Sequence, residues 1–164
     1  MSDYGEQVDT IAAELSRALH SVDAAALDAF AEALSRAPRV LVAGKGRSGL
    51  MMRAFAMRLM HVGLMVYVVD DVTTPALTAG DLLVIGSGSG TTPTLVRYAE
   101  RARSLGARLA LVTTAPSSPI GTLADHALVL AAASPRVAGS VESIQPMANL
   151  FEQALLLVLD IVVM

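Results

Sequence analysis

The chain has 164 residues, no cysteine and a formal net charge of −3 at pH 7. Hydrophobic residues make up 54% of it and charged residues only 16%, which argues against a disordered chain and against nucleic acid as a partner. Because cysteine is absent, disulfides, thiolate catalysis and cysteine-ligated metals are excluded.

A high mean hydropathy of +0.57 raises the question of a membrane protein. The longest apolar run, residues 154–164, is interrupted by Asp160 and falls short of the ~18–20 residues that a spanning helix needs. Residues 1–6 lack the basic and apolar regions of a signal peptide. We therefore expect a cytoplasmic protein without a membrane partner, a homo-oligomer whose excess apolar surface is covered by other copies of the chain.

Residues 1–36 are predicted to form two helices. Apolar residues recur at helical spacing on both sides of a break at residues 21–23, where Asp23 is suited to cap the second helix. The apolar positions are Ile11, Leu15, Ala18 and Leu19 before the break, and Leu27, Phe30, Ala31 and Leu34 after it.

From Pro38 onward, short apolar runs rich in Val and Leu alternate with helical stretches. The runs are residues 40–43, 65–69, 82–85, 109–112 and 127–130. Continuous hydrophobicity is typical of strands buried on both faces, and intervening helices imply a parallel sheet. We predict a single α/β domain over residues 1–164. It is a three-layer α/β/α sandwich, flavodoxin-like or Rossmann-like, whose core (38–133) holds a five-stranded parallel sheet.

A long C-terminal helix is predicted over residues 143–164. In its first half, polar residues are spaced to share one face: Gln145, Asn149, Glu152 and Gln153. Residues 155–159 are apolar all round, as expected for a helix buried on every side.

Two turns carry residues suited to bind an anion. Residues 44–49 (Gly-Lys-Gly-Arg-Ser-Gly) follow the first strand and precede a predicted helix over 50–62, and residues 86–92 (Gly-Ser-Gly-Ser-Gly-Thr-Thr) follow the third strand and precede a helix over 94–105. In an open parallel sheet, ligands bind at the carboxyl ends of the strands, where helix N-termini attract phosphate. The two turns therefore predict a phosphate site.

Two other interpretations of these turns stay open. The first turn matches G-x-G-x-x-G, and Asp70 follows the second strand where a dinucleotide-binding protein holds the ribose. However, the serine and threonine density of the second turn has no place in a nicotinamide site, and the lysine of a Walker A loop is missing from it. The second turn would otherwise be a flexible Gly/Ser connection.

Six motifs from Gly44 onward occur together in this chain. They are Gly44-x-Gly46-Arg47-Ser48-Gly49, Phe55-Ala56-Met57-Arg58-Leu59-Met60-His61, Thr73-Thr74-Pro75-Ala76, Gly80-Asp81-Leu82-Leu83, Ser87-Gly88-Ser89-Gly90-Thr91-Thr92, and Gln145-Pro146-Met147 with Leu150-Phe151-Glu152-Gln153. Taken together, the motifs resemble those of the SIS (sugar isomerase) domain proteins, and within them the 6-phospho-3-hexuloisomerase group. The resemblance covers nearly the whole chain from Pro38 onward, although Asp70-Asp71 stands where it implies Gly-Glu and family chains usually continue a little beyond the last helix.

The resemblance implies an isomerase that converts D-arabino-hex-3-ulose 6-phosphate to D-fructose 6-phosphate through an enediolate, without a cofactor. It further implies a homotetramer that serves the ribulose monophosphate pathway of formaldehyde fixation. Two alternatives remain: a non-catalytic sugar-phosphate-binding SIS domain, and an SIS isomerase of another phosphosugar.

For the phosphate, the resemblance assigns four hydroxyl side chains and three backbone groups: Ser48, Ser87, Ser89 and Thr92, with Gly88, Gly90 and Thr91. Their place at two predicted helix starts supports this assignment independently. Arg47 is expected to add a charged contact, or else to be a solvated surface arginine. Lys45, the only lysine of the chain, is expected to pack or to point to solvent.

For the base, the resemblance indicates Glu152. This carboxylate precedes an all-apolar run and should be partly desolvated, which suits a general base. A buried structural salt bridge is the alternative. We expect Glu152 to reach a site on a neighbouring subunit, because the end helix is the favoured oligomer element.

For ring opening or a second proton transfer, the resemblance favours His61. The competing explanation is that His61 only ends a helix before Gly63, where a histidine is stabilised by the helix dipole. His20 and His126 are expected to be surface or strand-edge residues. The scattered histidines lack the clustered spacing of a metal site, so no metal is predicted.

Overall fold

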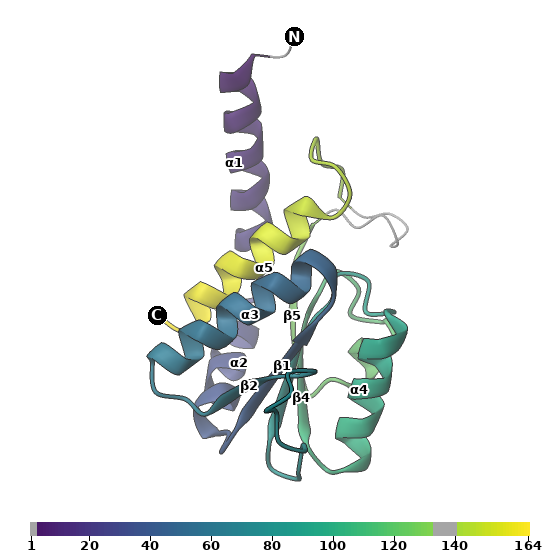
Figure 1. Cartoon of the computed structure of the whole chain (residues 1–164). Coiled ribbons are helices and arrows are strands. Elements are labelled where there is room, and N and C mark those ends of the chain that lie inside the picture. The colour runs from purple at the N-terminus through teal and green to yellow at the C-terminus, as the bar shows by residue number, and fades with distance from the viewer. Residues whose placement is uncertain (1–2, 133–140) are drawn as a thin grey trace.

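Five parallel strands form one sheet at the centre of the molecule (Figure 1). The computed structural model describes residues 3–132 and 141–164. The strand order is β2-β1-β3-β4-β5, and every neighbouring pair is parallel. In chain order the elements are α1 (Tyr4–His20), α2 (Ala24–Arg36), β1 (Val40–Gly44), α3 (Gly46–His61), β2 (Val66–Val68), β3 (Leu82–Gly86), α4 (Pro93–Ser104), β4 (Arg108–Thr113), the 3-10 turn η1 (Gly121–Leu123), β5 (His126–Val129) and α5 (Asn149–Val162).

Alternate residues of the strands contribute to two separate hydrophobic cores. Val40 and Val42 pack with residues of α2, α3 and α5 on one face, whereas Leu41 and Ala43 pack with residues of α4 on the other. Figure 1 shows α3 and α5 together on one side of the sheet and α4 on the opposite side. The predicted three-layer α/β/α arrangement is therefore confirmed, and the continuous apolar runs reflect burial on both faces.

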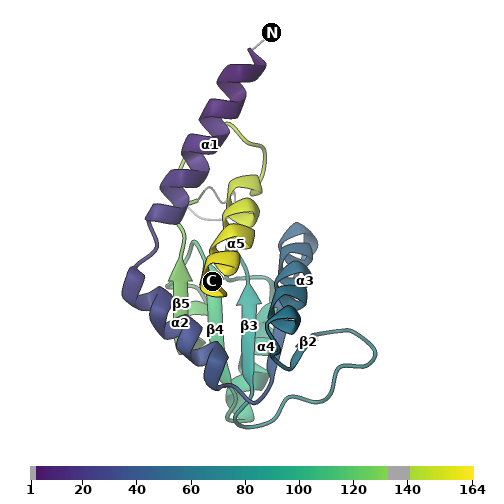
Figure 2. The same ribbon diagram turned by 90° about the vertical axis from the view of Figure 1, so that its left-hand side faces the viewer.

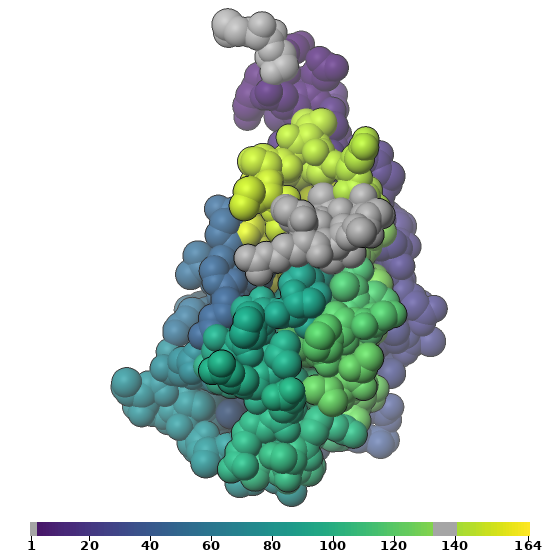
Figure 3. All heavy atoms as spheres, turned by 90° about the vertical axis from the view of Figure 1, so that its right-hand side faces the viewer, coloured from purple at the N-terminus to yellow at the C-terminus, as the bar shows by residue number. Residues whose placement is uncertain are grey.

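The predicted break between the first two helices is also confirmed. The Asp23 side chain accepts a hydrogen bond of 2.8 Å from the Ala26 backbone nitrogen at the start of α2. Asp3 caps α1 in the same manner through Gly5 N, at 3.1 Å. Helix α1 projects beyond the rest of the molecule (Figures 2 and 3).

Helix α5 starts later than the sequence predicts. It begins at Asn149, not at residue 143, because Met147 adopts a positive φ of 59° that is incompatible with a helix. Gln145 consequently precedes α5 and does not share a helical face with Glu152. The predicted burial on every side is also wrong for Leu157, which is 38% exposed.

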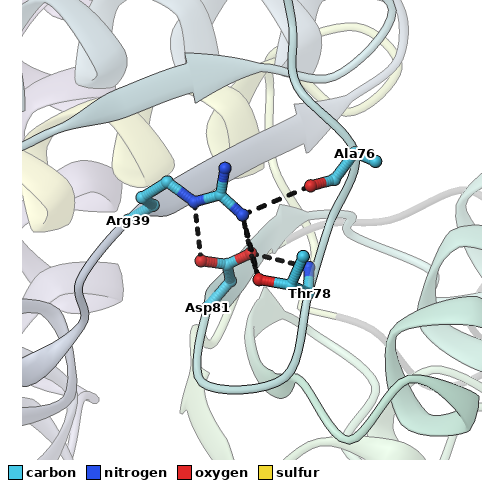
Figure 4. A network of polar contacts seen from close by, with 4 residues as sticks. All are labelled: Arg39, Ala76, Thr78 and Asp81. Carbon is cyan, nitrogen blue, oxygen red and sulfur yellow. Dashed lines mark hydrogen bonds and ion pairs between the residues drawn. The ribbon is translucent and has the colours of Figure 1, made fainter.

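An ion pair joins the beginnings of two central strands at the amino end of the sheet (Figure 4). Arg39, just before β1, donates through Nε to Asp81 Oδ1 (2.9 Å) and through Nη2 to Asp81 Oδ2 (2.6 Å). Thr78 donates to Asp81 Oδ2 through its backbone nitrogen (2.7 Å) and its hydroxyl (2.9 Å). The Arg39 guanidinium also donates to the Ala76 carbonyl at 3.3 Å, so the loop before β3 is closed by a network of short contacts.

In the described ranges, no helix has the length and apolar character required to traverse a bilayer.

Candidate active site

The turns that follow β1 and β3 border one pocket at the carboxyl end of the sheet. β1 and β3 are neighbours in the sheet, and β2, which lies between them in the sequence, is on the other side of β1. The strand order therefore reverses between β1 and β3, and parallel sheets bind ligands at such a topological switch point. The pocket has a volume of about 240 Å³, and its lining comprises Lys45, Ser48, Gly86, Ser87, Gly88, Ser89, Thr92, Leu95, Met147, Ala148 and Phe151.

The first turn is folded into the beginning of a helix. Residues 46–49 belong to α3, which places Arg47 and Ser48 on its first turn. Gly49 is required there by packing, because a Cβ atom at this position would lie 2.8 Å from the Gly44 carbonyl oxygen. Lys45 is the N-cap of α3, and its side chain makes no capping hydrogen bond, so the side chain leaves the amides of this helix start uncapped.

The second turn is held in shape by its own hydroxyl groups. Ser87 Oγ accepts a hydrogen bond from Gly90 N at 3.2 Å, and Ser89 Oγ accepts one from Thr91 N at 3.3 Å. Gly90 has a φ of 59°, and a Cβ atom there would lie 1.9 Å from Ser118 Oγ. Both serines are buried, which means that their hydroxyl groups can turn toward a ligand only within the pocket.

The carbonyl of Gly88 accepts three hydrogen bonds from residues at and just beyond the end of β4. The donors are Thr113 Oγ1 at 2.9 Å, Thr114 Oγ1 at 2.9 Å and Thr114 N at 3.0 Å. These bonds fix the orientation of the peptide in the middle of the serine turn. Sequence analysis missed both threonines, because their motif follows a different strand and only the sheet order brings it here.

Glu152 lies beside this pocket and forms an ion pair with Arg47 of the same chain. Arg47 Nε donates to Glu152 Oε1. The Glu152 side chain is 6% exposed, whereas that of Arg47 is 65% exposed. Phe151, the residue before Glu152, lines the pocket, as does Ser48, the residue after Arg47. The buried salt bridge therefore exists, and it lies next to the two turns that border the pocket.

The expectation that Glu152 reaches a site on a neighbouring subunit stays a prediction, and within its own chain Glu152 already has a partner. Its position in the first turn of α5 and the packing of α5 on α3 place it next to the pocket of its own chain, without making it part of the pocket wall. His61 behaves differently. It is the last residue of α3 and is exposed, about 22 Å along the helix axis from the first turn. One chain alone does not bring His61 to the pocket.

Of the residues predicted to bind phosphate, five line the pocket and two lie in the adjacent turn without lining it. Ser48, Ser87, Ser89, Thr92 and the backbone of Gly88 line the pocket. Gly90 and Thr91 belong to the same turn without forming part of the wall. Thr92 is the N-cap of α4, and its side chain makes no capping hydrogen bond.

Lys45 and Asp70 form a contact that bears on the dinucleotide interpretation. Lys45 Nζ donates to Asp70 Oδ2 at 2.7 Å and lies 5.7 Å from the centroid of the Tyr98 ring. Tyr98 donates its hydroxyl to Asp70 Oδ1 at 2.5 Å. Hydrogen bonds from Lys45 and then from Tyr98 lower the pKa of Asp70. The acid that a dinucleotide ribose would require is thus already bonded on both oxygens.

The segment before α5 is attached to α1. Glu14, a buried residue of α1, accepts hydrogen bonds from Ser143 Oγ (2.6 Å), Ile144 N (2.9 Å) and Gln145 Nε2 (3.2 Å). Burial alone would raise the pKa of Glu14, but these hydrogen bonds lower it overall. Figure 2 shows this segment running beside α1 before it enters α5. Glu14 thereby fixes the position of the segment that brings Met147 to the pocket.

Comparison with known proteins gives consistent results. The SIS domain family matches residues 33–157. The 3-hexulose-6-phosphate isomerase of Mycobacterium gastri is 44% identical, over 98% of this chain and 80% of that protein. The enzyme of the same name from Bacillus subtilis (strain 168) is 42% identical, over 97% of this chain and 86% of that protein. A crystal structure from Methanococcus jannaschii, from which a 3-hexulose-6-phosphate isomerase function was inferred, superposes with a TM-score of 0.81 at 28% identity, over 96% of this chain and 87% of that one.

Proposed function

The chain belongs to the SIS domain family, and from this membership we infer that it is an isomerase that converts D-arabino-hex-3-ulose 6-phosphate to D-fructose 6-phosphate. Two relatives with this activity in their names are 42% and 44% identical over nearly the whole chain. The observation that carries the mechanism is the buried carboxylate of Glu152, paired with Arg47 beside the hydroxyl-lined pocket.

The reaction moves a carbonyl group from carbon 3 to carbon 2 of the sugar. A base removes the proton from carbon 2, an enediolate forms, and a proton is delivered to carbon 3, so that no electrons enter or leave. We assign the base to Glu152, because its carboxylate is largely withdrawn from water and because a general base must lie beside the bound substrate. The same carboxyl group can return the proton on the same face of the enediolate.

Arg47 suits two tasks in this mechanism. Its Nε–H holds the Glu152 carboxylate in one orientation. The rest of the guanidinium is exposed and carries further N–H donors that can bind the oxygens of the enediolate, where negative charge develops. A fixed donor aimed at developing charge is a large source of catalysis.

The phosphate group is assigned to the two helix starts. The hydroxyl groups of Ser48, Ser87, Ser89 and Thr92 and the backbone amides of Gly88, Gly90 and Thr91 supply neutral donors. The carbonyl of Gly88, held by β4 and the residue after it, keeps this set in place before the ligand arrives. The sugar then extends from the phosphate toward Glu152.

We also propose that residues 1–164 form one SIS domain and that copies of it assemble as a homotetramer in the cytoplasm, where the reaction serves formaldehyde fixation by the ribulose monophosphate pathway. Helices α3 and α5 pack on each other (Figure 1) and carry exposed apolar side chains, which support an interface on these two helices. These side chains are Leu50, Met57, Met60, Leu157 and Ile161. Leu155, Val158 and Leu159, by contrast, lie in the core of their own chain. An interface on α3 would also bring His61 close to a second copy.

The test is a coupled assay. Formaldehyde, ribulose 5-phosphate and a hexulose-phosphate synthase supply the substrate, and the appearance of fructose 6-phosphate is followed after this protein is added. We expect formation well above the synthase-only control. Binding of fructose 6-phosphate without turnover would instead indicate a sugar-phosphate sensor, and turnover of a different phosphosugar would reassign the substrate.

A further inference from the structure

The phosphate pocket has one charged side chain in its wall, and it is Lys45. Among the residues that the structure describes as lining this pocket, all others are neutral. The hydroxyl and amide donors of the two turns can orient a phosphate, but they carry no formal charge to balance a dianion. The two helix starts contribute only partial positive charge, and in a chain with a net charge of −3 a local cation would supply the full charge that they lack.

Two cations are near enough to be considered, and the burial of their partners distinguishes them. If Arg47 left Glu152, it would strand a carboxylate that is 6% exposed, which is costly because a buried charge without a partner is strongly destabilised. Lys45 is bonded to Asp70, whose side chain is 49% exposed. Asp70 would keep the hydroxyl of Tyr98 and would gain water.

The position of Lys45 allows such an exchange. Lys45 lines the phosphate pocket and also a second hollow of about 270 Å³, whose lining includes Asp70. The lysine side chain is 43% exposed, and its four-carbon stem lets the ammonium group move between neighbouring positions. The hydrogen bond to Asp70 raises the pKa of Lys45, so the group is charged at neutral pH.

We propose that Lys45 is a further substrate-binding residue, whose ammonium group leaves Asp70 for the phosphate when the phosphosugar enters. Asp70 and Tyr98 hold the ammonium group when the pocket is empty. This role rests on the proposed function, because it requires that the pocket binds a phosphosugar. It does not depend on which hexulose phosphate is isomerised. It assigns a binding role to a side chain that the sequence analysis expects to pack or to point to solvent.

The experiment uses the fact that the chain has a single lysine. Reductive methylation with carbon-13 formaldehyde labels Lys45 and the N-terminal amine and leaves the positive charge in place. The Lys45→Met variant identifies the lysine signal by its loss. We expect this signal to shift on addition of fructose 6-phosphate or inorganic phosphate, and to stay unchanged with fructose.

Three variants measure the contribution of the charge. Lys45→Met should raise the Kd for fructose 6-phosphate about tenfold, in keeping with the loss of one charged hydrogen bond, and the difference should shrink at high salt. Lys45→Arg should restore most of the affinity. Asp70→Asn should tighten binding about twofold to threefold by removing the competing anion, and Asn tolerates the positive φ of 77° at this position.

The outcomes separate this inference from the proposed function. If the unsubstituted protein binds fructose 6-phosphate and Lys45→Met binds it equally well, or if the lysine signal does not move, the role of Lys45 is overturned and the function stands. If Asp70→Asn weakens binding, the exchange is overturned. If the unsubstituted protein binds no phosphosugar, the phosphate pocket itself is wrong, and both proposals fall.

Discussion

Two arginine–carboxylate pairs, one at each end of β1, differ in how completely their carboxylates are bonded. Asp81 receives two hydrogen bonds from Arg39 and two from Thr78, so both of its oxygens are occupied (Figure 4). The Glu152 carboxylate has one hydrogen bond within residues 3–132 and 141–164, from Arg47. Both carboxylates are buried.

The difference shows which pair maintains the fold and which is available to a ligand. A buried carboxylate with all its partners in place stabilises the structure around it, and it has no capacity left for a substrate. A buried carboxylate with one partner, beside a pocket, has that capacity. We therefore assign a structural role to the pair at the amino end of the sheet, and the proposed chemistry to the pair at the carboxyl end.

The largest effect that this comparison predicts is the loss of turnover in Glu152→Gln. The substitution keeps the shape of the side chain but removes the base, so we expect kcat to fall about 10³-fold. The melting temperature should change little, because the exposed Arg47 remains solvated. Kinetics and thermal unfolding measured on the same preparation test this. Residual turnover within tenfold of the unsubstituted enzyme would contradict the assignment.

Asp81→Asn is the matched substitution at the other end of the sheet. It leaves Arg39, whose side chain is 23% exposed, without its counter-charge, and we expect the free energy of unfolding to fall by about 3 kcal/mol. Denaturant unfolding gives the value, and kcat per folded molecule should be retained. A loss below about 1 kcal/mol would show that the two pairs do not differ in the way inferred.

Acid should destabilise the fold through two buried carboxyl groups, Asp81 and Glu14. Burial alone would raise the pKa of Asp81, but Arg39 and Thr78 lower it overall, and the pKa of Glu14 is also lowered. A carboxyl group with a lower pKa in the folded state stabilises the fold fully above its unfolded-state pKa, about 4, and this contribution is lost as pH falls through the folded value. Unfolding free energies measured from pH 6 to pH 2 should therefore decline, and less steeply in Asp81→Asn. Parallel curves for the two proteins would contradict this.

A smaller effect is expected where the residues beyond β4 support the serine turn. Thr114→Val removes one of the three donors to the Gly88 carbonyl, which should raise KM for the phosphosugar about threefold to tenfold. Thr114→Ser keeps the hydroxyl and is the control. Equal KM values for the Thr114→Val and Thr114→Ser variants would show that the hydroxyl group does not position the serine turn.

Most of the fold follows from local features of the sequence. The Val- and Leu-rich runs indicate strands buried on both faces, and Asp23 indicates the start of α2; both predictions are confirmed. The start of α5 was predicted too early because helical spacing of polar residues continues back to Gln145. Tertiary contacts decide otherwise, since Glu14, in a distant helix, binds Gln145 outside α5.

The site was only partly predictable, for a related reason. Glycines and hydroxyl residues after strands indicate a phosphate pocket from sequence alone, and the turns do meet. The pairing of Arg47 with Glu152 joins residues 105 positions apart, and no local pattern encodes it. Lys45 is expected to pack or to point to solvent, because nothing in its surrounding sequence shows Asp70 and Tyr98 beside it.

The edges of the sheet limit how copies of this chain can associate. β2, at one edge, contributes three residues and β5, at the other, contributes four, so an added strand could form only a short ladder of hydrogen bonds. Short edge strands discourage the strand-to-strand extension that leads to aggregates. Association through the exposed apolar side chains of helices α3 and α5 would instead depend on contacts between side chains, which determine which surfaces fit.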